Sequence, residues 1–160
     1  MIERNLRKDD LGIISEWFKH SSDWIKEEGL LKEEIDPQRI EVWMALYDRY
    51  EGVWLVWEDN KSIKGISYHI LDSPSNKKPW IGMVMVDPQD RGHGYGRRII
   101  QLVCRKLQQE PDNIVFAGCP FRQVKWLRFL AACDFEQIGL DTLSGKRYIK
   151  LARLLLPNDQ

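Results

Sequence analysis

The spacing of hydrophobic residues changes along the chain, and the N-terminal third is mainly helical in pattern. Residues 2–7 predict a short strand, and residues 11–18 then carry apolar side chains at helical spacing. A second helix is predicted from Pro37 to Tyr50, because Pro37 suits a first helical turn. The acidic residues 27–34 lie between these two helices and are compatible with part of a further helix.

The middle of the chain has the composition of strands. The runs Val53–Trp57 and Ile63–Leu71 are rich in β-branched and aromatic residues, and the very short gap between them predicts a hairpin. Turn-forming residues fill positions 72–79. The nearly continuous apolar run Trp80–Val86 then predicts a strand that is covered on both faces.

The last third alternates between helical and extended patterns. Five elements are predicted there: a helix at 94–109 that ends before Pro111, a strand at 114–117, a helix at 122–133, and strands at 135–140 and 146–151. The order strand, helix, strand around residues 94–109 predicts a crossover between parallel strands. The expected fold class is α/β (α+β), with a mixed, mostly antiparallel sheet of six to seven strands, helices on both faces and one βαβ unit.

Length, charge and cysteine content narrow the function classes. A chain of 160 residues predicts one domain spanning residues 1–160. Lys plus Arg and Asp plus Glu balance at 24 each, so there is no general attraction to nucleic acid. The three cysteines form no CxxC pair. The N-terminus lacks the apolar run of a signal peptide, and no apolar stretch approaches the ~18 residues of a membrane span. We therefore expect a cytoplasmic protein that binds neither nucleic acid nor membrane.

A glycine-rich loop joins the buried strand at Trp80–Val86 to the next helix. Its glycines alternate along the chain: Gly92, Gly94 and Gly96. Glycines let a ligand approach the backbone, and the unpaired amides and dipole at a helix N-terminus favour an anion. Arg91, Arg97 and Arg98 add guanidinium groups suited to phosphate. The loop therefore predicts a pyrophosphate site rather than a solvated turn.

Two other phosphate-binding motifs fit this loop less well. A P-loop ends in Gly-Lys followed by Ser or Thr, and this ending is absent from the segment. The dinucleotide fingerprint GxGxxG fails because Arg97 stands where its last glycine belongs.

The segment resembles the signature Arg/Gln-x-x-Gly-x-Gly/Ala of the GCN5-related N-acetyltransferase (GNAT) superfamily. Arg91, Gly94 and Gly96 occupy its fixed positions, and Val86 and Pro88 supply the Val-x-Pro approach. The order of elements resembles that fold over essentially the whole chain. The resemblance implies an acetyl-CoA-dependent N-acetyltransferase without a metal. Its acceptor would be a primary amine of a small molecule or an amino group of a protein.

The resemblance also implies a CoA site. The backbone of the buried strand is expected to pair with the pantetheine arm, the loop amides to hold the pyrophosphate, and Gln123 to reach the pantetheine. Arg91 is expected to shape the loop more than to bind phosphate. The expected CoA-binding residues are Val84, Met85, Val86, Arg91, Gly92, His93, Gly94, Tyr95, Gly96, Arg97 and Gln123.

The catalytic residues of the family cannot be carried over. Leu130 stands where many members have a Tyr, and Gly118 stands where a Glu is often found. Tyr68 and His69 are substitute candidates, but adjacent residues on a strand face opposite ways, so only one can enter an acceptor cleft. The catalytic residues are therefore unknown from the sequence.

Three further questions stay open in the sequence. The acidic residues 27–34 mildly favour a cationic acceptor. A non-catalytic acyl-CoA sensor of the same fold is the alternative function, motivated by Leu130 and Gly118. A homodimer through the C-terminal strands is an option.

Overall fold

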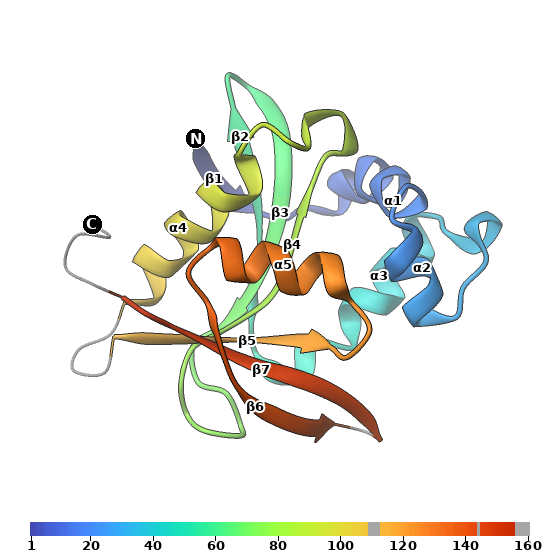
Figure 1. Ribbon diagram of the computed structural model, residues 1–160. Helices are drawn as coiled ribbons and strands as arrows, with labels where there is room; N and C mark the ends of the chain where they lie inside the picture. Colours follow the sequence, from blue (N-terminus) through green and yellow to red (C-terminus); the bar gives the residue numbers. More distant parts are fainter. Residues whose placement is uncertain (109–112, 144, 156–160) are drawn as a thin grey trace.

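The computed structural model describes residues 1–108, 113–143 and 145–155. Seven strands form one sheet in the order β1-β2-β3-β4-β5-β7-β6 (Figure 1). The strands are β1 (Ile2–Asn5), β2 (Val53–Asp59), β3 (Ser62–Ile70), β4 (Trp80–Val86), β5 (Ile114–Pro120), β6 (Glu136–Leu143) and β7 (Lys146–Leu154). The helices are α1 (Leu11–Lys19), α2 (Ser22–Glu28), α3 (Pro37–Ala45), α4 (Tyr95–Leu107) and α5 (Val124–Ala132).

The predicted fold class is confirmed. Every strand pair in the sheet is antiparallel except β4 with β5, which are joined by α4 as the predicted βαβ unit. That residues 1–160 make a single domain stays a prediction. The edge strand β6 exposes Ile138 and Leu140, and the homodimer through the C-terminal strands also stays a prediction.

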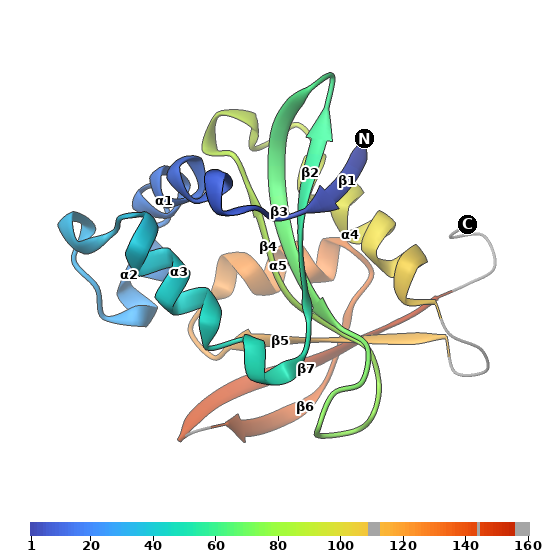
Figure 2. The ribbon, with the colours of Figure 1, turned by 180° about the vertical axis from the view of Figure 1, so that it is seen from behind.

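Helices cover both faces of the sheet. From behind, α1 and α3 lie in front of the strands, whereas α4 and α5 lie on the other side (Figure 2). Each face has its own apolar core: one joins α1 and α3 to Ile66 and Met85, and the other joins α4 and α5 to Ile81 and Leu151. The sheet is therefore buried on both sides, as expected for strands that are apolar almost throughout.

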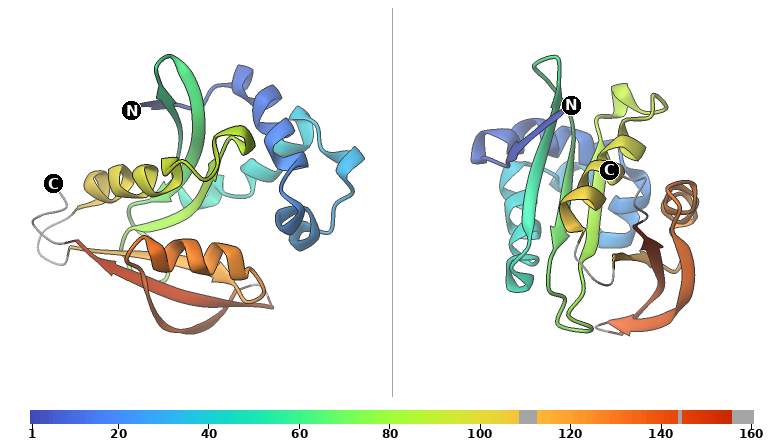
Figure 3. Two further views of the ribbon diagram at one scale, coloured as in Figure 1. Left: turned by 45° about the horizontal axis from the view of Figure 1, so that its top comes forward. Right: turned by 90° about the vertical axis from the view of Figure 1, so that its left-hand side faces the viewer.

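Strands β4 and β5 stay together for only a short distance. They pair at Trp80 with Phe116 and at Ile81 with Ala117, and then separate (Figure 3). Gly82 follows at once, in a register irregularity between β3 and β4. A side chain at Gly82 would meet the ring of Tyr68, because an added Cβ would lie 2.8 Å from Cδ1. Glycine thus permits the bulge with which the two strands diverge.

Several predicted boundaries were wrong. The second predicted helix ends at Ala45 instead of Tyr50, with a separate 3-10 turn at Asp48–Tyr50. The acidic stretch 27–34 is partly helical, as expected: helix α2 (Ser22–Glu28) begins before it and ends within it, and a 3-10 turn follows at Lys32–Glu34. Strands β5, β6 and β7 run three residues beyond their predicted ends, since strand ends depend on pairing with distant neighbours. Helix α4 ends at Leu107, and Pro111 lies outside the described residues.

A buried ion pair fixes the start of α1 against the sheet edge. The Asp10 carboxylate is 6% exposed and accepts two hydrogen bonds from the Arg4 guanidinium, at 2.9 and 2.8 Å. It also accepts the Arg7 amide at 2.7 Å, and Arg4 donates to Glu58 on β2 at 2.8 Å. The Arg4 hydrogen bonds, with that of Arg7, hold the pKa of Asp10 below its usual value. One network therefore joins β1, α1 and β2.

We predict that Asp10→Asn lowers the free energy of unfolding by about 2 kcal/mol at pH 7, because it leaves the Arg4 guanidinium short of a charged partner. Folding lowers the pKa of Asp10, so its contribution is complete above about pH 4 and is lost as the pH falls through the folded-state pKa. Urea denaturation between pH 3 and 7 should show a gap between wild type and variant that closes on acidification. Glu16→Gln, which removes the exposed pair with Lys19, is the control and should cause no measurable change. A constant gap across the pH range would contradict the prediction.

Candidate functional site

The opening between β4 and β5 presents unpaired backbone groups of β4. The Met85 carbonyl points to β3, since it lies 2.6 Å from the position of a Cβ added to Gly65. The Asp87 amide likewise donates to the Lys64 carbonyl of β3 at 2.8 Å. Peptide groups alternate along a strand, so the amides of Val84 and Val86 point away from β3 and into the opening. An extended chain could pair with β4 there as an added strand.

The glycine-rich loop follows β4 directly and ends in the first turn of α4. Gly92 and Gly94 have φ values of +79° and +84°, which L side chains rarely adopt. A Cβ added at either glycine would meet nothing within 4 Å, so the space above the loop is open. In the described chain, the amides from Gly92 to Arg97 have no hydrogen-bond partner. The loop therefore offers a row of free donors at a helix N-terminus, an arrangement that suits a phosphate.

Arg91 acts within the loop as a brace. Its Nε donates to the Val86 carbonyl at 3.2 Å, and its Nη2 donates to the Ser21 hydroxyl at 3.3 Å. Burial lowers the pKa of this guanidinium. His93 also turns back on the loop, with Nδ1 3.0 Å from the Arg91 carbonyl. Both side chains thus hold the loop conformation.

Packing fixes the far side of the loop. Lys64 on β3 pairs with Asp90 at 3.2 Å and lies 5.3 Å from the centre of the Tyr95 ring. A Cβ added to Gly96 would approach the Phe129 ring of α5 to 3.0 Å, so glycine here allows α4 and α5 to pack closely. Arg97 is exposed on the first turn of α4.

Helix α2 crosses between the two sides of the opening. Its N-terminal end contacts the β4–α4 loop through Ser21 and Arg91. It also contacts the start of α5, where the Gln123 side-chain amide donates to the Asp23 carbonyl at 3.3 Å and Lys125 lies 3.9 Å from the Asp23 carboxylate. Gln123 thus stands at the opening, in contact with α2.

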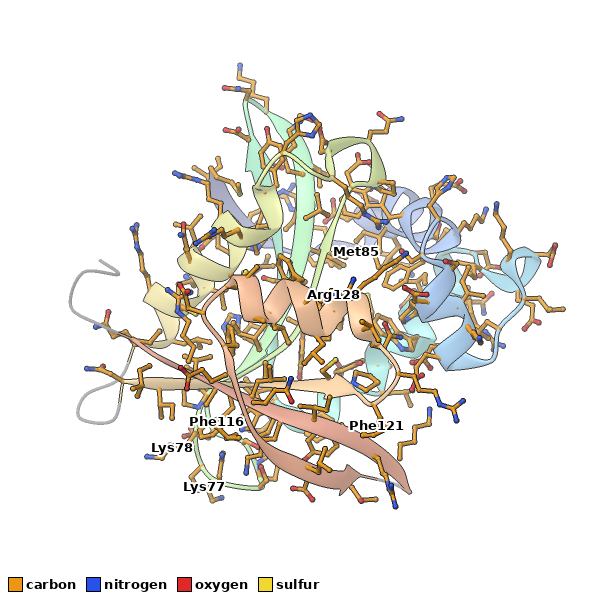
Figure 4. The ribbon with its side chains drawn as sticks, viewed as in Figure 1. Lys77, Lys78, Met85, Phe116, Phe121 and Arg128 are labelled. Atoms are coloured by element: carbon orange, nitrogen blue, oxygen red, sulfur yellow. The ribbon has the colours of Figure 1, made fainter. Side chains whose placement is uncertain are left out.

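A cavity of about 490 Å³ begins beside the opening, on the face of the sheet that carries α1–α3. Gly82 of β4 and Gly118 of β5 line its inner end. Its walls include aromatic residues from several elements: Trp43, Tyr47, Tyr50, Tyr68, Trp80 and Tyr148. Phe116 stacks on Trp80 and lies beside the β3–β4 loop, where its amide donates to the Pro79 carbonyl at 3.0 Å (Figure 4).

The two substitute candidates on β3 lie apart. Tyr68 lines the cavity, but its hydroxyl donates to the Tyr47 carbonyl at 2.8 Å. His69 is 5% exposed and is not among the residues that line the cavity. Burial, followed by the Lys106 ammonium, lowers the pKa of His69, so the ring is neutral near pH 7. The side chains of Tyr68 and His69 thus point to opposite faces of the sheet, as expected for adjacent residues on a strand.

The positions of the missing acid and base carry no polar side chain. Leu130 is fully buried in the core of α4 and α5. At Gly118, an added Cβ would lie 3.4 Å from the Tyr148 ring of β7, so Tyr148 covers this position. Sequence spacing gave no hint of Tyr148, because it reaches the cavity from a strand late in the chain.

The tryptophans divide between the two faces of the sheet. Trp24, Trp43 and Trp54 belong to the aromatic cluster of the α1–α3 face, and only Trp43 of these lines the cavity. Trp57 lies in the opposite core and donates to the Ser67 hydroxyl at 2.8 Å.

Within the ranges that the structure describes, no three or more His, Cys, Asp or Glu side chains gather as a metal site. None of the described helices combines the length and apolar character that crossing a membrane requires.

Comparison with known proteins adds sequence and fold relatives. The model of the "Acetyltransferase (GNAT) family" matches residues 13–135. The chain is 36% identical over 125 residues to the uncharacterized protein YkzC of Bacillus subtilis (strain 168), covering 78% of this chain and 87% of that protein.

Two solved structures share the fold. One is a chimera of the spermidine N-acetyltransferase SpeG from Vibrio cholerae and hSSAT, with a TM-score of 0.66 and 16% identity, covering 96% of each chain. The other is yncA from Salmonella typhimurium, a putative acetyltransferase with its cofactor acetyl-CoA. Its TM-score is 0.61 with 16% identity, covering 98% of this chain and 94% of that chain.

The three cysteines, Cys104, Cys119 and Cys133, form no disulfide and are at most 1% exposed. Burial raises the pKa of both Cys119 and Cys133 to about 11. At pH 8 such a thiol is only about one part in a thousand thiolate.

We predict that iodoacetamide at pH 8 leaves the folded protein unlabelled for an hour, whereas urea-unfolded protein gains three adducts by mass spectrometry. Rapid labelling of Cys119 in the folded protein would show an accessible thiol beside the opening.

Proposed function

This chain belongs to the acetyltransferase (GNAT) family, and from this premise we propose that it is an acetyl-CoA-dependent N-acetyltransferase. The acceptor is a primary amine of a small molecule or an amino group of a protein. The observation that carries the proposal is the continuity of β4 with its loop: an unpaired strand edge leads directly into a row of free amides. An extended pantetheine arm and its pyrophosphate need these two features in this order.

The residues of the loop fit a pyrophosphate. The free amides from Gly92 to Arg97 lie at the N-terminal end of α4, where the helix dipole is positive and favours an anion. The open space above Gly92 and Gly94 leaves room for the pyrophosphate. Arg97 adds a guanidinium on the first turn, while His93 and Tyr95 contribute their amides. Arg91 keeps the loop in shape through Val86 and Ser21.

The strand edge fits the pantetheine arm. Val84 and Val86 are the pairing residues in this proposal, because the peptide groups of Met85 face β3. Gln123 is the side-chain contact, and it exchanges its hydrogen bond to Asp23 for one to the arm.

Acetyl-CoA supplies a thioester whose carbonyl carbon bonds to the nitrogen of the neutral amine while the carbon–sulfur bond breaks. The amine gives up one proton to water, and the departing CoA thiolate takes one up from water. The chain contributes position: the Val84 amide faces the opening, where it can donate to the developing oxyanion. The cavity beside Gly82 and Gly118 brings the amine from the other face. With Leu130 buried and no side chain at Gly118, the proposal assigns no catalytic side chain and attributes the rate mainly to placing both reactants together.

The cavity favours a transferase over an acyl-CoA sensor. A sensor needs only the CoA site, whereas a second cavity that meets the opening suits an acceptor. The three cysteines, none of which forms a disulfide, suit a reducing compartment such as the cytoplasm, where we place the protein.

We predict that purified protein releases free CoA from acetyl-CoA in the presence of a suitable primary amine, because the two sites meet at the opening. A thiol assay across amino acids, diamines, aminoglycosides and lysine peptides should find one class with saturable turnover. Calorimetry with CoA on the same sample provides the control for a folded site. Binding of CoA without release by any class would support the sensor instead.

We predict that Gly94→Ala weakens CoA binding at least tenfold. The added Cβ disfavours the backbone at φ +84° by about 1 kcal/mol and projects into the space above the loop. Gly145→Ala is the matched control, because Gly145 has a φ of +76° with open space around it, in the β6–β7 turn. Both variants should lose similar thermal stability, and only Gly94→Ala should raise the Kd in calorimetry. Equal Kd values for the two variants would contradict the assignment of the loop.

A further inference from the structure

We propose that the acceptor is a primary amine that also carries an anionic group, as an amino acid does. This inference rests on the proposed transfer of an acetyl group and deepens it by naming the acceptor class. It is carried by charged residues of both signs that line one aromatic cavity and form no ion pair among the described residues.

The cavity has the size and the walls of a small-molecule site. About 490 Å³ lies within the range of pockets that hold metabolite-sized ligands. Tyr47 packs edge to face on Trp43 and Tyr68, with ring centres 5.2 and 5.0 Å apart. Aromatic faces of this kind bind methylene groups and attract ammonium ions.

Two acidic residues at the end of α2 belong to the cavity lining. Glu27 and Glu28 both line it, and within the described chain neither forms an ion pair. Burial, followed by the negative charge of Glu28, raises the pKa of Tyr47 to about 12. The field of Glu28 therefore reaches the aromatic wall, where it would attract an ammonium group.

Three exposed basic residues from two other elements also belong to the cavity lining. Arg49 follows α3, and Lys146 and Arg147 begin β7. Among the described residues none of the three has a carboxylate partner, and the Arg49 guanidinium lies 5.0 Å from the centre of the Tyr50 ring. Arginine forks in this position suit a carboxylate or phosphate.

The charges of the cavity lining distinguish between diamines or polyamines and amines that also carry an anionic group. Three cations against two carboxylates leave the cavity lining at +1, ignoring neutral residues. A diamine or polyamine would satisfy the carboxylates but would meet three cations without a counter-ion. A molecule that carries both an ammonium and an anionic group matches both sets of charges. The mild preference for a cationic acceptor, drawn from residues 27–34, stays a prediction, and the cavity lining adds an anionic group to it. Glu33 and Glu34 also lie outside the lining, and Glu34 pairs with Arg39 at 3.1 Å.

The test compares acceptors that differ only at the end remote from the amine. Wild-type protein with acetyl-CoA is assayed for CoA release with free α-amino acids and their carboxamides, and with γ-aminobutyrate, γ-aminobutyramide and putrescine. We expect the preferred free acid to exceed its carboxamide at least tenfold in kcat/KM, and putrescine to be the poorest of its set. A carboxamide or putrescine that equals or exceeds the free acid would overturn the inference and leave the transferase assignment standing.

Substitutions locate the effect in the cavity. The double variant Arg49→Gln with Arg147→Gln should lose about tenfold in kcat/KM with the preferred free acid and should keep the wild-type rate with its carboxamide. Lys77→Gln removes the same kind of charge from the β3–β4 loop, where Lys77 is exposed and outside the cavity lining, and should change neither rate (Figure 4). Equal losses with acid and carboxamide would overturn the role of the two arginines. If no compound released CoA from protein that binds it, the proposed transferase itself would fail, and the inference with it.

Discussion

The early separation of β4 from β5 is the constraint on which the site depends. Backbone donors and acceptors inside a protein need partners, and a sheet normally supplies them by pairing neighbouring strands. Here pairing stops after Ile81, and the amides of Val84 and Val86 face a gap instead of a strand. The cost of the gap is limited because the other neighbouring strands pair along most of their length and helices cover both faces of the sheet.

Three glycines beside this gap each have a different structural role. Gly82 permits the bulge because a Cβ would strike Tyr68, Gly94 permits the turn into α4 through its positive φ, and Gly96 lets α5 approach α4. Replacing any one by a larger residue would disturb a different part of the site. The loop is then held by Arg91 and by the pair of Lys64 with Asp90, so its amides remain in position.

Helix α2 connects the two halves of the site. Its first residues contact the glycine-rich loop through Arg91 and the start of α5 through Gln123, whereas its last residues, Glu27 and Glu28, line the cavity. In the proposed reaction, a change at Gln123 when CoA arrives would therefore act on the helix that carries the cavity carboxylates. In the proposed reaction, the CoA site and the acceptor site would thus be coupled through the same short helix, α2.

The sequence alone determined the fold class, the βαβ unit and the loop, because each depends on local spacing of apolar residues and glycines. Strand ends such as Leu143 and Leu154 could not be predicted, since they are set by pairing with residues far along the chain. The cavity was equally hidden: Arg49, Lys146 and Tyr148 carry no local signal, and only the packing of α3, β5 and β7 brings them beside Glu27. Local periodicity thus decided which elements form, and tertiary contacts between distant residues decided which side chains line the cavity.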